Sequence, residues 1–403
     1  MATIALLGTL DTKGAECAFV ADQIRARGYT ALLIDVGTSG SQPQVTPDIP
    51  RSEIVEGVNF AELDRGAAVQ AMSDAIPVLL ARLAAERKID GVISLGGAGG
   101  TAIATSAMRA LPIGFPKVMI STVAGGNAGA YIGVKDIVMF PSIVDVAGIN
   151  RISRNIFSCA AGAICGMVAT EIPSGQDRPL IAASMFGNTT DCVQTARSIL
   201  EDAGYEVLVF HATGTGGRTM ESLIDSGMIA GVLDVTTTEW ADELGGGVFN
   251  AGPGRLGGAA RNGVPAIVTP GCLDMVNFNE PETVPDRYEG RTFYQHNPQV
   301  TLMRTNADEC VELGRILAEK VNLSTGPASV LLPLKAISVI SAEGQPFHDP
   351  AADAALFEAI RSNLQKKIRL VEIDCTINDP EFARACAQAL LENLEQQSGG
   401  SEG

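Results

Sequence analysis

Short apolar runs alternate with longer segments of mixed polarity along most of the chain. The apolar runs of the first half are Thr3 to Leu7, Ala31 to Val36, Val92 to Leu95 and Pro116 to Ser121. Runs of this length with little polar alternation are typical of strands buried on both faces of a parallel sheet. The longer segments between them predict helices. The alternation therefore predicts an α/β fold with doubly wound, mostly parallel, Rossmann-like sheets.

The second half of the chain repeats the order of the first. A strand ending in Gly8-Thr-Leu-Asp11, a helix, Gly28-Tyr29 and a strand are mirrored by a strand ending in Gly187-Asn-Thr-Thr-Asp191, a helix, Gly204-Tyr205 and a strand. A polar linker rich in Pro and Gly, Glu171 to Pro179, separates the two halves. We therefore predict two apparently duplicated Rossmann-like domains, residues 1–174 and 179–397, followed by a flexible tail at 398–403.

Two stretches interrupt this pattern. Residues 37–66 are rich in Gly, Ser and Pro and predict a long, lid-like loop. From Pro270 to about His296 the chain is again polar and predicts a second long, irregular loop. We expect it to be functional, because compact domains rarely keep such loops otherwise. The last two strands are expected at Lys335 to Ser341 and Lys367 to Ile373.

The charge balance narrows the range of partners. The chain has 29 Lys and Arg against 46 Asp and Glu, a net charge of −17, so we expect neither nucleic acid nor an anionic membrane surface to bind it. The eight cysteines show no C-x-x-C spacing, which favours reduced thiols in a cytoplasmic protein over disulfides or a metal site. The N-terminus has no basic region followed by a long apolar segment, so no signal peptide is expected.

The most informative stretch is the strand Val92 to Leu95 and the glycines that follow it. These glycines, which lie just before an alanine-rich helix, are Gly96, Gly97, Gly99 and Gly100. We expect them to adopt positive φ and to let a ligand approach the backbone, while the N-terminus of the helix attracts an anion. The pattern predicts a phosphate site made of main chain; the alternative is a turn that only packs the helix on the sheet. No Walker A motif occurs, and the acidic residue that binds ribose in dinucleotide-binding folds is missing.

The loop after the first strand belongs to the same edge of the predicted sheet. Thr9, Thr12 and Lys13 could bind and neutralise phosphate. Asp11 could hold Mg²⁺ or a ribose hydroxyl. Alternatively, Asp11 or Thr12 only caps the following helix. Another glycine-rich loop, Thr122 to Asn127, follows the strand that ends at Ser121.

The candidate catalytic residues lie in and just after the second long loop. Arg287 and Arg304 could pair with a carboxylate or a phosphate of a substrate. His296 could transfer a proton near neutral pH. Alternatively, the arginines only fasten the loop by pairing with its own acidic residues, Glu280, Glu282 and Asp286.

Five segments, spread in order over the whole chain, are distinctive. They are Gly8-Thr-Leu-Asp-Thr-Lys13-Gly, Leu95-Gly-Gly-Ala-Gly-Gly-Thr101, Pro270-Gly-Cys-Leu-Asp-Met-Val-Asn-Phe278, Tyr294-Gln-His-Asn-Pro298 with Thr301-Leu-Met-Arg304-Thr305, and Phe347-His-Asp-Pro-x-Ala-Asp353-x-x-Leu-Phe357. Together they resemble the tomato mosaic virus resistance protein-like ATP-binding family. The resemblance implies two α/β domains, ATP bound to the N-terminal one, and self-association into a homo-oligomer. On this basis we place the nucleotide contacts on Gly8, Thr9, Asp11, Thr12 and Lys13, on Gly96, Gly97, Gly99, Gly100 and Thr101, and on Thr122, Gly125, Gly126 and Asn127.

Two functions are consistent with these features. The first is an ATP-dependent enzyme of small-molecule metabolism, ligase- or phosphotransferase-like. In it, ATP and Mg²⁺ would bind the first domain, and a carboxylate- or carbonyl-bearing substrate would lie at the domain interface. The second is a non-catalytic module in which bound ATP orders an oligomer. A nicotinamide-dependent oxidoreductase is disfavoured by the missing ribose-binding acid.

Overall fold

The computed structural model describes residues 1–173, 175 and 177–399, and the chain divides into two compact units, Met1–Ser174 and Gly175–Gly403. Each unit has its own sheet and its own hydrophobic core. We describe each unit by itself.

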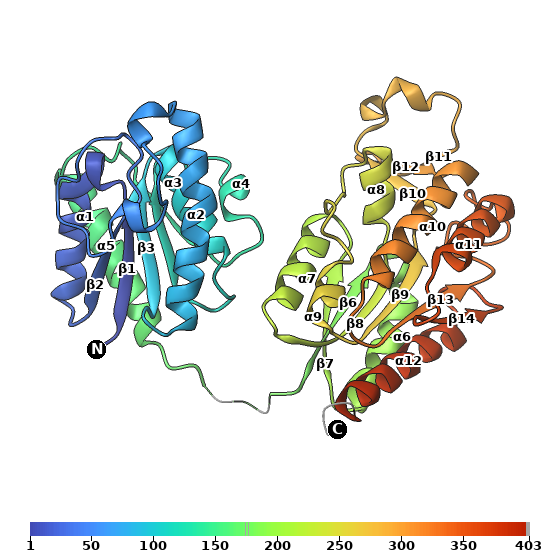
Figure 1. Ribbon diagram of the computed structural model, residues 1–403. Helices are drawn as coiled ribbons and strands as arrows, with labels where there is room; N and C mark the ends of the chain where they lie inside the picture. The colour runs from blue at the N-terminus through green and yellow to red at the C-terminus, as the bar shows by residue number, and fades with distance from the viewer. Residues whose placement is uncertain (174, 176, 400–403) are drawn as a thin grey trace. The chain divides into compact units, whose positions relative to one another are not determined.

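The N-terminal unit is a five-stranded parallel sheet with helices on both faces (Figure 1). Its strands are β1 (Thr3–Gly8), β2 (Thr30–Asp35), β3 (Gly91–Gly96), β4 (Lys117–Ser121) and β5 (Val138–Pro141). Its helices are α1 (Leu10–Arg25), α2 (Arg65–Ala85), α3 (Ala98–Arg109), α4 (Gly129–Ile132) and α5 (Arg151–Ala169), with short 3-10 turns η1 (Arg51–Glu53) and η2 (Phe60–Glu62). The strand order is β2-β1-β3-β4-β5.

Alternate side chains of each strand enter two separate cores, as expected for a strand covered on both faces. In β1, Ile4 and Leu6 pack into the core formed with α1 and α5. Their neighbours Ala5 and Leu7 pack into the opposite core, formed with α2 and α3. This is why the strands read as continuous apolar runs in the sequence.

The C-terminal unit contains a six-stranded parallel sheet and a three-stranded antiparallel sheet. Its strands are β6 (Leu180–Met185), β7 (Glu206–His211), β8 (Ile229–Thr236), β9 (Ala266–Gly271), β10 (Met275–Phe278), β11 (Phe293–Asn297), β12 (Val300–Arg304), β13 (Ala328–Pro333) and β14 (Arg369–Ile373). Its helices are α6 (Thr190–Asp202), α7 (Thr215–Asp225), α8 (Glu239–Gly245), α9 (Gly258–Asn262), α10 (Ala307–Asn322), α11 (Pro350–Asn363) and α12 (Pro380–Gly399), with 3-10 turns η3 (Gly187–Thr189), η4 (Pro281–Thr283) and η5 (Asp286–Tyr288).

The two parallel sheets share one topology. The strand order of the large C-terminal sheet is β7-β6-β8-β9-β13-β14. Its first five strands follow the N-terminal order β2-β1-β3-β4-β5, and β14 is an additional strand at the edge. The predicted fold class is therefore confirmed: both units are α/β, and both parallel sheets are doubly wound. In such sheets a ligand site forms at the carboxyl ends of the strands where the order reverses. Here these strands are β1 and β3 in the first unit, and β6 and β8 in the second.

Two predictions for the C-terminal unit were wrong. Much of the expected irregular loop from Pro270 to His296 is ordered, because β10 and β11 both pair with β12 in an antiparallel ribbon. Residues 335–341 form turns rather than a strand, and the strand lies earlier, at β13. The Ser341 hydroxyl accepts hydrogen bonds from the backbone amides of Ile337 and Ser338 and closes a local turn that β-branched composition does not reveal.

By length and composition, α2 and α5 could each cross a membrane, but two such helices are only weak evidence for a membrane-spanning protein. Both contribute side chains to the cores of the N-terminal unit, as helices of a doubly wound sheet do.

Candidate functional site

A cavity of about 640 Å³ lies at the carboxyl ends of β1 and β3 in the N-terminal unit. The glycine-rich turn after β3 and the loop after β1 both line it, because these two strands are neighbours at the reversal point of the sheet. The lid-like segment 37–66 contributes a third wall, through Thr38, Ser39, Phe60, Ala61 and Leu63. Two of the three predicted nucleotide loops are thus brought together.

The four glycines after β3 do not have the positive φ that we expected. Gly96, Gly97, Gly99 and Gly100 are absent from the positive-φ glycines of the described chain, so the prediction of a left-handed turn was wrong. Tight packing explains only the first of them, since a Cβ on Gly96 would lie 3.3 Å from the Cα of Gly100. A Cβ on Gly97, Gly99 or Gly100 would make ordinary contacts of 3.6 to 3.9 Å.

These three glycines surround the N-terminus of α3. The helix starts at Ala98 with Gly97 as N-cap, and its first bond between backbone groups joins the Thr101 amide to the Gly97 carbonyl at 2.8 Å. The amides of Ala98, Gly99 and Gly100 precede that bond and so have no acceptor within the helix. They line the cavity without side chains in front of them, which is the arrangement that binds an anion at a helix N-terminus.

Thr101 has a structural role at this turn. Its side chain is fully buried, and its hydroxyl donates to the Gly97 carbonyl at 2.8 Å and lies 2.6 Å from the Ser121 hydroxyl. The hydroxyl therefore ties the start of α3 to the end of β4, and Thr101 is not among the residues that line the cavity.

The loop after β1 contributes Thr9, Asp11, Thr12 and Lys13 to the cavity. The Lys13 ammonium donates to the backbone carbonyl of Val146. Gly8 has a packing role instead, because a Cβ there would lie 2.4 Å from the Cys17 sulfur.

Arg65, at the start of α2, also lines the cavity, and the sequence analysis missed it. It is exposed, and neither Arg65 nor Lys13 has a carboxylate partner within ion-pair distance in the described part of the chain. Both cations can therefore neutralise an anionic ligand. Arg65 lies 55 residues after Leu10, the first residue of α1, and this distance gave no spacing signal, since only the fold brings α2 to this edge.

Asp11 does not cap α1, whose N-cap residue is Thr9. One Asp11 oxygen, Oδ2, accepts from the backbone amide and the hydroxyl of Ser39 at 2.8 and 2.7 Å, and lies 3.3 Å from the Arg51 guanidinium. The other, Oδ1, is buried and has no hydrogen-bond partner in the described structure. Asp11 therefore fastens segment 37–66 to the cavity wall and leaves one buried oxygen without a partner.

A second buried carboxylate, that of Asp35, binds the loop after β1 and the start of segment 37–66. Asp35 accepts from the amides of Leu10 and Gly37 and lies 3.6 Å from Arg51. Burial is the main reason that the pKa of Asp35 is raised above its ordinary value. Arg51 thus joins both carboxylates to the lid segment, a role that nothing in the local sequence pattern indicated.

The third predicted loop, Thr122 to Asn127, does not line the cavity. The Thr122 amide donates to the Gly96 carbonyl at 3.3 Å, and the Asn127 side chain accepts from the Gly129 amide at 3.2 Å. Gly125 and Gly126 lie between them in an open turn with ordinary or no contacts at an added Cβ.

In the C-terminal unit, a glutamate side chain of the same chain occupies the glycine-rich turn. The amides of Gly214 and Gly217, at the start of α7, donate to one Glu239 oxygen at 2.7 and 3.1 Å. The other oxygen of Glu239 accepts from Arg255 at 2.5 Å, and both side chains are buried. An internal carboxylate thus occupies the place that an anionic ligand would take.

The three candidate catalytic residues have separate surroundings in the C-terminal unit. Arg304 is buried, pairs with Asp353 at 2.6 Å and donates to the Phe347 carbonyl at 2.9 Å. Arg287 donates to the Gly245 carbonyl at 3.1 Å, and its guanidinium lies 4.8 Å from the centre of the Tyr288 ring. His296 is exposed on β11. In the described chain, no hydrogen bond joins any two of the three, and the arginines do not pair with Glu280, Glu282 or Asp286.

No group of three or more His, Cys, Asp or Glu side chains within the described residues is arranged to hold a metal ion.

Both domains of the chain match the same protein family. Residues 2–173 match the N-terminal domain, and residues 178–394 the C-terminal domain, of the uncharacterised protein family UPF0261. A UPF0261 protein of Clostridium tetani is 49% identical over 401 residues, covering 98% of this chain and 99% of that protein. The ToMV resistance protein Tm-1(GCR237) of Solanum lycopersicum is 38% identical over 417 residues, covering 96% of this chain and 55% of that protein, so the chain spans about half the length of that relative. Among solved structures, MurG of Acinetobacter baumannii aligns at 12% identity over 97% of this chain and 100% of that one, with a TM-score of 0.23.

The resemblance to proteins named for tomato mosaic virus resistance is therefore confirmed at the level of the family. Binding of ATP stays a prediction.

Proposed function

The chain belongs to the uncharacterised protein family UPF0261, and for this member we propose that the cavity of the N-terminal unit binds the triphosphate of ATP. The observation that carries the proposal is the set of glycines at the start of α3. Gly97, Gly99 and Gly100 need neither positive φ nor tight packing. What they supply is backbone amides that a ligand can reach, at the positive end of a helix.

Charge at the cavity supports the same ligand. Lys13 and Arg65 line it without ion-pair partners among the described residues, in a chain with a net charge of −17. A triphosphate would accept hydrogen bonds from the α3 amides and be neutralised by these two side chains. The volume of about 640 Å³ lies within the range of small-molecule sites.

The free oxygen of Asp11 fits a role beside the phosphates. Protein sites bind Mg²⁺ through one or two carboxylates together with phosphate oxygens and water. Asp11 Oδ1 would supply one such ligand, or would accept from a ribose hydroxyl. A magnesium ion that arrives with the nucleotide would thus have one protein carboxylate beside the phosphate oxygens.

Substitution of Gly97 tests the proposal without disturbing the fold. There is room for a Cβ at Gly97, so Gly97→Asp should fold while placing a carboxylate against the α3 amides. We expect its affinity for ATP-Mg²⁺ to fall at least 100-fold in titration calorimetry, which is ~2.7 kcal/mol. Gly166→Asp, in an open position of α5, adds the same charge elsewhere and should leave the affinity unchanged.

Lys13→Ala provides a second, weaker test. Loss of one charge-assisted contact should reduce the affinity about tenfold. If Gly97→Asp and Lys13→Ala both bound ATP as tightly as the parent chain, the proposal would be wrong.

A non-catalytic role for bound ATP is the second candidate, and one observation favours it. Among the described residues no histidine lines the N-terminal cavity, and the Asp11 carboxylate is held by Ser39 and Arg51. Steady ATP turnover that is lost in His296→Ala would favour the ATP-dependent enzyme. Tight binding without turnover over a broad panel of metabolites would favour the module. A cytoplasmic location, homo-oligomer formation and a second substrate at the domain interface stay predictions.

A further inference from the structure

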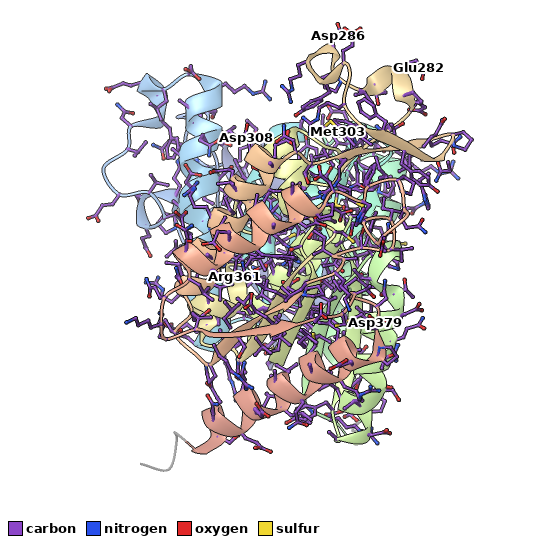
Figure 2. All side chains as sticks on the ribbon, turned by 90° about the vertical axis from the view of Figure 1, so that its right-hand side faces the viewer. Glu282, Asp286, Met303, Asp308, Arg361 and Asp379 are labelled. Atoms are coloured by element: carbon purple, nitrogen blue, oxygen red, sulfur yellow. The ribbon has the colours of Figure 1, made fainter. Side chains whose placement is uncertain are left out.

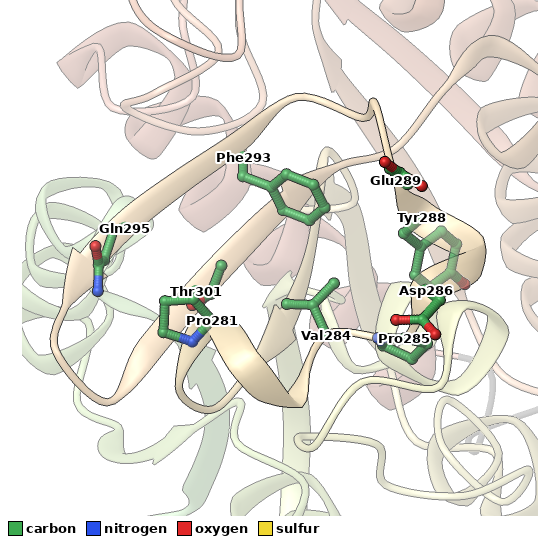
Figure 3. Close-up of a pocket in the computed structure, with 9 residues that line it drawn as sticks. All are labelled: Pro281, Val284, Pro285, Asp286, Tyr288, Glu289, Phe293, Gln295 and Thr301. Carbon is green, nitrogen blue, oxygen red and sulfur yellow. The ribbon is translucent and has the colours of Figure 1, made fainter.

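A second cavity, of about 460 Å³, lies within the C-terminal unit between the antiparallel ribbon and segment 280–290 (Figure 3). Its floor is one face of the ribbon. Phe293 and Gln295 lie two residues apart on β11 and so share a face, and Thr301 of β12 is the direct partner of Gln295. Val284 and Pro281, from segment 280–290, also line the cavity (Figure 3).

Thr301 is the observation that points to a ligand. Its side chain is only 4% exposed, it lines the cavity, and its hydroxyl has no hydrogen-bond partner in the described structure. A buried hydroxyl without a partner costs about 1–3 kcal/mol, and the large majority of such groups in folded proteins are paired. Polar groups among the apolar side chains of a cavity fix the orientation of a bound small molecule.

The charge at the mouth of the cavity specifies the kind of molecule. Asp286 and Glu289 line it, both are exposed, and neither forms an ion pair within the described chain. Figure 2 shows Asp286 and Glu282 on a segment that projects from the rest of this unit. The two nearby guanidinium groups lie over the ring of the lining residue Tyr288, at 4.8 Å for Arg287 and 5.7 Å for Arg291. Both already have partners, since Arg287 donates to the Gly245 carbonyl and Arg291 pairs with Glu309 at 2.6 Å.

From these contacts we propose that this cavity binds a small organic ammonium ion with an apolar, aromatic-sized body. The body packs against Val284, Pro281 and the ring of Phe293, which is 39% exposed and can also attract the cation. The ammonium group is neutralised by Asp286 and Glu289. A polar hydrogen of the ligand is accepted by Thr301, which removes the cost of its unpaired hydroxyl.

The test uses the full chain and three probes of one shape and different charge: 2-phenylethylammonium, 2-phenylethanol and 3-phenylpropionate. Titration calorimetry should show that the ammonium ion binds at least tenfold more tightly than the alcohol, and that the carboxylate binds more weakly than both. The proposal is overturned if the ammonium ion shows no binding up to about 10 mM, which is tenfold above a Kd of 1 mM, or if the alcohol binds equally well.

Variants separate a ligand-binding role from a structural one. Thr301→Val keeps the shape and removes a hydroxyl that has no partner, so its unfolding midpoint should be unchanged or higher while 2-phenylethylammonium binds at least fivefold more weakly. The double variant Asp286→Asn with Glu289→Gln should lose the preference for the ammonium ion over the alcohol. Glu282→Gln, on the same segment but outside the cavity, should behave as the parent. Unchanged ammonium affinity in Thr301→Val and in the double variant would overturn the proposal.

Discussion

Asp242 and Glu239 are buried carboxylates three residues apart on α8, and they have different partners. Glu239 is paired with the Arg255 guanidinium at 2.5 Å. Asp242 accepts from the backbone amide and from the side-chain amide of Asn277, both at 2.7 Å, and has no cation beside it among the described residues. Burial, as the largest cause, raises the pKa of Asp242 to about 8. A carboxyl group without a cation is thus kept protonated by its surroundings.

The raised pKa of Asp242 predicts that the protein loses stability as the pH rises. The unfolded chain releases this proton near the ordinary value of 3.8, whereas the folded chain holds it to about pH 8. Above pH 4 the folded state therefore binds more protons, and the free energy of unfolding falls by up to ~1.4 kcal/mol per pH unit until pH 8. Asp353, with a pKa raised to about 6 mainly by burial, adds to the slope only below that pH.

Urea unfolding of the parent and of Asp242→Asn between pH 6.5 and 8 measures the contribution of Asp242. The Asn277 oxygen is buried without a partner, so a flip of its amide can satisfy the new side chain. We expect the variant to have a flatter pH dependence than the parent. Equal slopes for the two proteins would show that Asp242 does not titrate in this range.

At the scale of elements, α3 and α7 start with similar glycine-rich turns that differ in what faces their amides. The α3 amides face a cavity, while those of α7 face the Glu239 carboxylate. A Cβ on Gly217 of α7 would lie 2.2 Å from that carboxylate, whereas one on Gly99 of α3 would lie 3.6 Å from Val69. One turn is closed by an internal anion and the other is open.

This difference predicts opposite responses to alanine. Gly217→Ala should displace Glu239 from Arg255, leave a buried charge poorly paired, and lower the free energy of unfolding by about 3 kcal/mol. Gly99→Ala adds a helix-favouring residue where there is room, so its stability should equal or exceed that of the parent by up to ~1 kcal/mol. Chemical unfolding monitored by circular dichroism compares them. Equal destabilisation by both substitutions would contradict this account of the two turns.

At the scale of the whole molecule, the chain is two units with separate sheets and separate cores. The residues proposed to hold ATP all lie in the first unit, and those proposed to hold an ammonium ion all lie in the second. Each unit contains the helices that cover both faces of its own parallel sheet.

We therefore expect residues 1–173 to fold alone and to keep ATP binding. The fragment should unfold cooperatively on heating, and its affinity for ATP-Mg²⁺ should lie within about threefold of that of the full chain. The thermal shift produced by ATP gives a second readout, since a ligand that binds only the native state raises its melting temperature. A folded fragment that does not bind ATP would show that the site needs more than the N-terminal unit.

The fold class and part of the candidate site could be predicted from local patterns. Buried strands followed by glycines and amphipathic helices have a period and a composition that short windows reveal. The antiparallel ribbon could not be predicted in this way, because β11 is short and almost wholly exposed, so it shows no alternation of apolar and polar residues. The turn at residues 335–341 depends on hydrogen bonds to the Ser341 hydroxyl and was predicted wrongly as a strand.

The sequence by itself determined two repeated α/β domains and a helix start with accessible amides, because apolar spacing and clustered glycines act over a few residues. Only the tertiary structure decided which glycine-rich turn is open. Glu239 reaches the α7 amides from 22 residues further along the chain, and Arg65 joins the N-terminal cavity through the packing of α2. Likewise, the buried pair of Arg304 and Asp353 joins residues that are 49 positions apart in the sequence. Such contacts depend on how distant segments pack, and no local pattern of residue types encodes them.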